Sequence, residues 1–291
     1  MYQLWDIHDI KYILKKHGFA FSKALGQNFI VDAAVCPAIV EGAAIGEEDY
    51  VLEIGPGIGV LSAELCKSAK KVVAVELDKR LPDILADTLA DFDNFELVEG
   101  DILKLDLQTL WQEHFAGAEK VKICANLPYY ITSPVIMRFL ESELPIESIT
   151  VMVQREAGER ICAPLGSKQA GAVTVAVQYY ARAEELFFVP KEAFLPSPKV
   201  DSEVIQLTVR EQPPMDAVDE KLFFKVVKAA FLQRRKAAAN SLSAGLAMPK
   251  AEVITMLETL GFSPNCRAEN FSMEDFAAIT AYLAKGADNN E

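Results

Sequence analysis

The feature that most constrains the fold of this chain is a regular alternation of short apolar runs and helical segments after residue 50. The apolar runs, each long enough for a buried strand, occupy 50–54, 72–75, 95–98, 121–125 and 149–153. The segments with helical apolar spacing include 32–46, 60–67, 79–89 and 134–140. Strands that alternate with helices at this spacing predict a parallel, doubly wound sheet.

The pattern changes toward the end of the chain. Two later strands are expected at 173–180 and 204–209, and the second alternates as an edge strand does. After a proline-bearing linker at 211–214 there is no strand signal, and apolar residues recur at helical spacing. We therefore expect a main domain over 1–213 and a smaller all-helical domain over 215–291.

Composition narrows the class of protein. The 291 residues are 51% apolar and 24% charged, which is ordinary for a folded soluble chain. No apolar run approaches the roughly 18 to 20 residues of a membrane span. The N-terminus lacks the basic and then apolar order of a signal peptide. The five cysteines lack C-x-x-C spacing and the three histidines lack metal-ligand spacing. We therefore expect free thiols in a reducing cytoplasm, and no metal.

The net charge of −13 argues against a generally basic surface for nucleic acid. From Lys225 to Asn240, however, there are five basic residues and no acidic one. A local patch of this kind can contact phosphates while the rest of the surface stays acidic. The alternative for this patch is a solvated helix face.

A glycine-rich turn, Glu53–Gly59, joins an expected strand to an expected helix. Such turns let the backbone approach a ligand closely. The G-x-G-x-G spacing differs from the G-x-G-x-x-G of dinucleotide sites, and an acid two residues before Gly55 would repel a pyrophosphate. The ligand is therefore expected to be neutral or cationic. S-adenosylmethionine, with its sulfonium and amino group, fits.

Two acids end the next strands. Glu76 ends the second strand, where its oxygens can accept hydrogen bonds from both hydroxyls of a ribose. The alternative is an exposed acid at a strand end. Asp101 ends the third strand, where a carboxylate can accept a hydrogen bond from the adenine amine of the cofactor. The alternative there is a helix cap after Gly100.

The fourth strand ends in the stretch Asn126-Leu127-Pro128-Tyr129. The Asn126 side-chain oxygen and the Leu127 carbonyl can accept the two N–H bonds of an adenine amine, which localises its lone pair. Pro128 fixes the backbone, and Tyr129 offers a stacking face for the base. The alternative is a turn after a strand, because Asn-x-Pro is common in turns.

Gly55, Glu76, Asp101 and Asn126 all lie at the ends of four successive expected strands. In an open parallel sheet, ligands bind at the carboxyl ends of the strands. Four independent turns at these places are a poor explanation of the pattern. We therefore predict one crevice that holds both a methyl donor and a planar amine.

The same residues, in this order, resemble the class I S-adenosylmethionine-dependent methyltransferases, and more narrowly the ribosomal RNA adenine dimethyltransferase family. Further segments similar to that family's motifs are 25–32, 154–160, 194–202, 231–236 and 240–242. The resemblance covers nearly the whole chain and favours the bacterial type that acts on the small ribosomal subunit. It implies a Rossmann-like fold and dimethylation of two adjacent adenosines near the 3′ end of 16S rRNA, linked to 30S biogenesis.

The resemblance also implies roles for individual residues. An N-terminal segment, 1–31, would contribute to the cofactor and RNA sites. The cofactor would be contacted by Asn28, Ile30, Gly55, Glu76, Asp101 and Asn126. The target base would be held by Asn126, Leu127, Pro128 and Tyr129, with Phe194 on the other side of a stack. The phosphates would be contacted by Arg234, Arg235 and Lys236. The expected partner is 16S rRNA in a 30S subunit or its precursor, bound by a cytoplasmic monomer.

Three alternatives stay open. An Erm-type methyltransferase would share the fold and modify 23S rRNA, although the Asp201-Ser202 loop ending and the Arg-Arg-Lys run favour the small-subunit type. A DNA adenine methyltransferase would use the same Asn-x-Pro-Tyr stretch, but no domain that recognises DNA is evident in the sequence. Finally, the protein would act mainly as an assembly factor if binding to immature small subunits mattered more than methylation.

Overall fold

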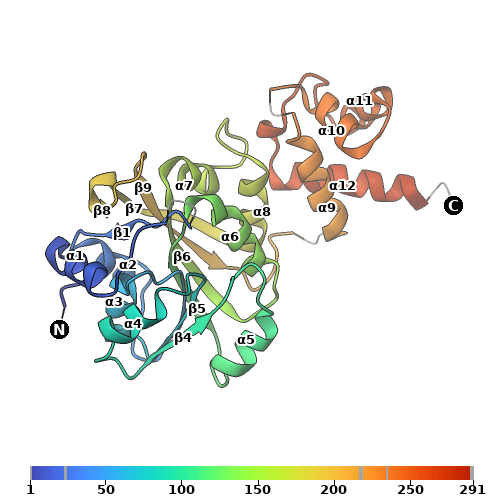
Figure 1. The fold of residues 1–291 in the computed structure, drawn as a ribbon. Helices are drawn as coiled ribbons and strands as arrows, with labels where there is room; N and C mark the ends of the chain where they lie inside the picture. The colour runs from blue at the N-terminus through green and yellow to red at the C-terminus, as the bar shows by residue number, and fades with distance from the viewer. Residues whose placement is uncertain (1, 23–24, 216–218, 234, 289–291) are drawn as a thin grey trace. The chain divides into compact units, whose positions relative to one another are not determined.

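A computed structural model describes residues 2–22, 25–215, 219–233 and 235–288 (Figure 1). Its contacts divide the chain into two compact units. The first unit contains Met1–Gly158 and Arg182–Val209, and the second contains Glu159–Ala181 and Arg210–Glu291. This division differs from the expected one at residue 213, because residues 159–181 belong with the C-terminal helices.

The first unit is built on a seven-stranded sheet with the order β4-β3-β2-β5-β6-β9-β7. Its strands are β2 (Tyr50–Ile54), β3 (Lys71–Glu76), β4 (Phe95–Glu99), β5 (Val121–Asn126), β6 (Ile146–Gln154), β7 (Ala181–Val189) and β9 (Ser202–Val209). The five strands from β4 to β6 pair in parallel, and β9 pairs antiparallel to β6. The predicted doubly wound, mostly parallel sheet is confirmed.

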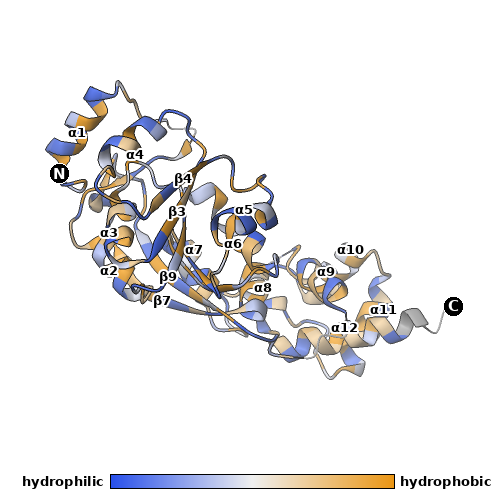
Figure 2. Ribbon diagram, turned by 90° about the horizontal axis from the view of Figure 1, so that it is seen from below, coloured by the Kyte–Doolittle hydropathy of each residue, from blue (hydrophilic) through white to orange (hydrophobic). Residues whose placement is uncertain are grey.

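Helices connect the strands of this unit. They are α1 (Ile7–Lys16), α2 (Val35–Gly42), α3 (Val60–Ser68), α4 (Pro82–Thr88), α5 (Leu107–His114) and α6 (Thr132–Leu140), with α7 (Arg155–Cys162) at the unit boundary. Each has an apolar face that it buries; in α1 this face is Ile10, Ile13 and Leu14. The ribbon of α1 accordingly alternates between polar and apolar residues in Figure 2.

A second, two-stranded sheet joins distant parts of the first unit. β1 (Phe29–Ile30) pairs antiparallel with β8 (Phe194–Leu195), so that Ile30 lies opposite Phe194. The N-terminal segment and the late loop are thereby brought together, although Ile30 and Phe194 are 164 positions apart in sequence. Both residues are buried, and this pairing positions them for the site described below.

Two predictions for the later part of the sheet are wrong. The segment 173–180 is not a strand; it lies in a helix, α8 (Ala172–Tyr180), and the strand is the following segment, β7. The side chain of Thr174 accepts a hydrogen bond from the Gly171 N–H at 2.8 Å, which fixes the first turn of α8. The segment 204–209 is not an edge strand either, because β9 lies between β6 and β7. Its first four residues are all buried.

The second unit is helical in its described part. Its helices are α8, α9 (Glu220–Ala230), α10 (Ala238–Leu246), α11 (Lys250–Thr259) and α12 (Met273–Asp288). Val175 and Tyr179 are one helical turn apart on α8 and are buried in the same apolar core as Phe223 and Phe276. This packing explains why residues 159–181 join the second unit. Ser272 caps α12 by accepting a hydrogen bond from the Asp275 N–H.

Candidate active site

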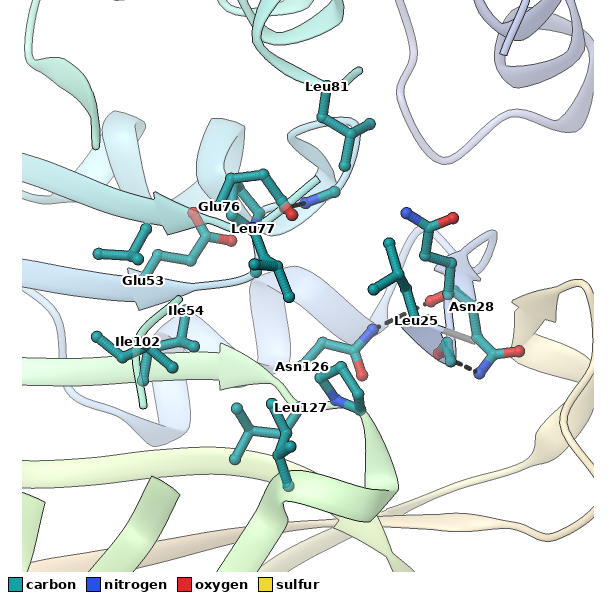
Figure 3. Close-up of a pocket in the computed structure, with 18 of the residues that line it drawn as sticks. Leu25, Asn28, Glu53, Ile54, Glu76, Leu77, Leu81, Ile102, Asn126 and Leu127 are labelled. Carbon is teal, nitrogen blue, oxygen red and sulfur yellow. Dashed lines mark hydrogen bonds between the residues drawn. The ribbon is translucent and has the colours of Figure 1, made fainter. Parts of the chain in front are cut away.

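A pocket opens at the carboxyl ends of four neighbouring strands, β4, β3, β2 and β5 (Figure 3). It contains about 1040 Å³ of space, counting the part that is open to solvent. All ten residues predicted for the cofactor and the base line it: Asn28, Ile30, Gly55, Glu76, Asp101, Asn126, Leu127, Pro128, Tyr129 and Phe194. The predicted convergence of the strand ends therefore exists in the structure.

The glycine turn forms the floor of this pocket. Gly55, Gly57 and Gly59 all have positive φ angles, of +70°, +60° and +90°, which side chains with a Cβ adopt only with strain. A Cβ built on Gly55 would meet no atom within 4 Å. The backbone therefore presents open pocket space at this point, where a ligand can lie directly against the chain.

Glu76 points into the pocket rather than into solvent, with only 7% of the residue exposed. Its Oε1 accepts a hydrogen bond from the Asp78 N–H at 2.7 Å, and its Oε2 accepts one from the Gly57 N–H at 3.4 Å. Burial raises the pKa of this carboxyl, and the backbone N–H groups partly oppose the increase. The carboxylate is thus fixed in place with lone pairs left for a ligand, and the exposed-acid alternative is excluded.

Asp101 lines the pocket and also makes two contacts with neighbouring residues of the chain. Its Oδ1 accepts a hydrogen bond from the Leu103 N–H at 3.0 Å, and its Oδ2 pairs with the Lys104 ammonium at 3.1 Å. These contacts lower the pKa of Asp101, the Leu103 N–H most of all. The alternative, a helix cap, is wrong: Asp101 precedes a turn at 102–104, and the next helix, α5, is capped by Asp106. Asp101 lies in the pocket as predicted.

Asn126 is oriented by the N-terminal segment. Its side-chain amide donates a hydrogen bond to the Asn28 carbonyl at 3.2 Å, and Asn28 donates in turn to the Gly26 carbonyl at 3.0 Å. With the amide nitrogen engaged, the Asn126 side-chain oxygen has no partner among the residues that the structure describes. The Leu127 N–H is bound to the Met152 carbonyl. The arrangement leaves the two predicted acceptors, the Asn126 oxygen and the Leu127 carbonyl, to a ligand.

The aromatic part of the site is held from two sides. The Tyr129 hydroxyl forms a hydrogen bond of 2.9 Å with Ser202, the first residue of β9. Burial raises the pKa of this hydroxyl, so Tyr129 stays neutral at physiological pH. Phe194 is buried and is held by the β1–β8 pairing. Both residues line the pocket, and an aromatic ring beside a planar base can stack on it.

One acid of this pocket was not predicted as a site residue. Glu53, on β2, lines the pocket and is 1% exposed. Its Oε2 has no hydrogen-bond partner among the described residues. Burial raises the pKa of Glu53 to about 8, and the neighbouring Glu76 adds to the increase. The acid two residues before Gly55 is visible in the sequence and predicts a neutral or cationic ligand, but it was not among the predicted contact residues.

The three predicted phosphate contacts are placed only in part. Arg234 lies outside the described residues. Arg235 and Lys236 are exposed and lie between α9 and α10, in the second unit. Nothing in their geometry distinguishes a solvated connection from an RNA contact, so their role stays a prediction.

More than nine-tenths of the chain is similar to known proteins. The family model described as "Ribosomal RNA adenine dimethylase" matches residues 18–285. The "Ribosomal RNA small subunit methyltransferase A" of Shouchella clausii (strain KSM-K16) is 45% identical over 273 residues, which are 93% of this chain and 92% of that protein. The protein of the same name from Geobacillus thermodenitrificans (strain NG80-2) is 45% identical over 276 residues, 94% of each chain.

Solved structures share the fold. The dimethyladenosine transferase from Plasmodium falciparum has a TM-score of 0.72 at 24% identity and covers 89% of this chain and 98% of its own. The 23S rRNA methyltransferase ErmE has a TM-score of 0.66 at 26% identity, with coverage of 88% and 99%. In the described residues, no helix combines the length and apolar character that crossing a membrane requires.

Proposed function

Because this chain belongs to the ribosomal RNA adenine dimethylase family, we propose that it uses S-adenosylmethionine to dimethylate N6 of two adjacent adenosines near the 3′ end of 16S rRNA. The observation that carries this proposal is the convergence of all ten predicted residues on one pocket. We propose that a monomer binds its substrate, a 30S subunit or its precursor, in the cytoplasm. The choice of this substrate rests on the similarity, over more than nine-tenths of the chain, to proteins named ribosomal RNA small subunit methyltransferase A.

The residues present fit the cofactor. The open space against Gly55 accommodates the part that crosses the glycine turn. Glu76 has lone pairs for the ribose hydroxyls, and Asp101 has a lone pair for the adenine amine. When bound, S-adenosylmethionine supplies a methyl group that its positive sulfur already activates. No strong base is then needed from the chain, because the methylated nitrogen loses its proton to water after each transfer.

The chain's contribution is to hold the target amine in line with that methyl group. The Asn126 oxygen and the Leu127 carbonyl accept its N–H bonds and direct its lone pair. The same oxygens, with the π face of Tyr129, stabilise the positive charge that develops on the nitrogen. Orientation of this kind supplies on the order of 7 kcal/mol or more of the barrier reduction.

The base must leave its stack to reach the pocket, at a cost of a few kcal/mol. Stacking of Tyr129 and Phe194 on the two faces of the flipped base would offset part of that free energy. For the second methylation the amine has one N–H left, so one of the two acceptors must tolerate losing its donor. Pro128 keeps both acceptors at a constant spacing through both steps.

The test is methyl transfer from labelled S-adenosylmethionine to 30S particles that lack this modification. We expect labelled N6,N6-dimethyladenosine in 16S rRNA, and a loss of at least 100-fold for Asn126→Ala. Labelling of free 23S rRNA with none of 30S particles would favour the Erm type instead. If Asn126→Ala abolished methylation and retained every cellular effect of the protein, the assembly-factor function would be the main one.

A further inference from the structure

Among the described residues, the charged ones that line the pocket are all acidic. Three acids line it, Glu53, Glu76 and Asp101, and no lysine, arginine or histidine is among the described residues that do so. Asp101 has its own cation in Lys104, and Glu76 accepts two backbone hydrogen bonds. Glu53 has neither, so it is the acid of this pocket whose negative charge would lack a compensating cation or backbone N–H group.

Glu53 lies deep in the unit as well as in the pocket wall. It is on β2, the strand between β3 and β5, and Figure 3 shows its carboxyl next to Glu76. Its Oε2 is buried without a hydrogen-bond partner in the described part of the chain. Buried polar atoms are usually paired, and an unpaired buried carboxylate is costly. The group is therefore expected to be a neutral acid until a cation comes near.

The groups that face Glu53 from other elements do not supply that cation. They are Glu76 on β3, Cys36 on α2, Cys66 on α3 and Cys124 on β5. Burial, and then Glu53 itself, raise the pKa of all three thiols, so they stay uncharged. The Ser62 hydroxyl on α3 opposes the pKa increase of Glu53 only in part.

We propose that Glu53 is the counter-charge for a cationic group of the methyl donor: it carries a proton in the free protein and gives that proton to solvent when the donor binds. The inference rests on the proposed function and specifies how the same pocket selects its ligand. S-adenosylmethionine has two candidate cations, the sulfonium and the ammonium. After methyl transfer the sulfonium is a neutral thioether, so a Glu53 that faces it takes a proton back from solvent as the product leaves.

The experiment is calorimetric titration of the full chain with S-adenosylmethionine at pH 7, in two buffers with different ionisation enthalpies. The number of protons released follows from the difference between the two heats. With the pKa of Glu53 near 8 in the free protein, the wild type should release between about half a proton and one proton per ligand through this residue. Glu53→Gln, which mimics the neutral acid, should lack that release.

Two comparisons isolate Glu53 from other titrating groups. Glu76 also has a raised pKa, so the quantity of interest is the difference between the wild type and Glu53→Gln. Glu252→Gln removes an exposed carboxyl of α11 and should behave as the wild type. Between pH 5.5 and 7.0, the affinity of the wild type should rise roughly 30-fold more than that of Glu53→Gln, because binding requires the charged acid.

The choice of ligand identifies the cation. S-adenosylhomocysteine keeps the ammonium and lacks the sulfonium, and methylthioadenosine lacks both. If S-adenosylmethionine causes proton release and S-adenosylhomocysteine does not, the sulfonium is the group that Glu53 compensates. If each of the two ligands causes proton release when added separately, that group is the ammonium. Equal proton release by the wild type and Glu53→Gln would overturn the inference, even if the enzyme binds and methylates normally. Absence of any S-adenosylmethionine binding would instead refute the proposed function.

Discussion

A methyl group added to the glycine turn tests the position of the cofactor directly. In Gly55→Ala the new Cβ would enter pocket space that no protein atom occupies within 4 Å, at a φ of +70°. Gly117→Ala is a matched control in the same unit, with a φ of +88° and equally open surroundings, before β5 and outside the pocket. Both substitutions carry the same backbone strain, about 1–2 kcal/mol.

The two variants should therefore lose similar stability but differ in binding. If the cofactor lies against the turn, the Cβ of Gly55→Ala overlaps with it and weakens S-adenosylmethionine binding by about tenfold or more, which is about 1.4 kcal/mol. Gly117→Ala should bind as the wild type does. Thermal unfolding reports the strain and calorimetric titration reports the affinity. Equal affinities for the two variants would refute the placement of the cofactor on this turn.

Other substitutions test separate parts of the account. Because the folded protein raises the pKa of Glu53 to about 8, the free energy of unfolding of the wild type should fall as pH rises from about 4.5 through 8, by on the order of 3–5 kcal/mol. Denaturant unfolding of Glu53→Gln should lack that decline. If the wild type and Glu53→Gln showed the same dependence of stability on pH, the burial argument would be contradicted. Tyr129→Phe keeps the ring and loses only the hydrogen bond to Ser202, so its KM for RNA should change little. Tyr129→Ala loses the stacking surface and should raise KM for RNA about 5- to 100-fold. Equal KM values for the two variants would exclude stacking. Ser272→Ala removes the cap of α12 and should cost about 1 kcal/mol of stability with no change in S-adenosylmethionine affinity, which a thermal scan and a titration would check.

The strands that build the pocket were predictable from the sequence. β2, β3 and β5 are central and buried, so each is a mostly apolar run, although β2 contains Glu53 and β5 contains Lys122. The same logic located the strand ends, since a polar residue after such a run marks where the strand leaves the core. Gly55, Glu76 and Asn126 were found in this way, and all three line the pocket.

Prediction failed where a local pattern fits two structures. The run Val173–Tyr180 is rich in β-branched and aromatic residues, which favour strands, yet tertiary packing made it a helix. Its Val175 and Tyr179 complete an apolar core with α9 and α12, and only the folded chain shows that contact. The strand β7 carries exposed acids such as Glu184 and Glu185, so it lacks the apolar run that identifies a buried strand.

The role of Glu53 illustrates a different limit. Its position before the glycine turn is plain in the sequence, but whether a carboxyl there is paired depends on its neighbours in space. The structure surrounds it with Glu76, thiols and apolar side chains. No spacing rule contains that information, because the neighbours come from four different elements, α2, α3, β3 and β5.

The most direct test of the central claim is a crystal structure with S-adenosylmethionine bound. We predict a cofactor whose ribose hydroxyls lie within hydrogen-bond distance of the Glu76 carboxylate. Its methyl group should point toward the Asn126 oxygen, between Tyr129 and Phe194. A cofactor bound elsewhere, or one whose methyl group points away from Asn126, would contradict the account.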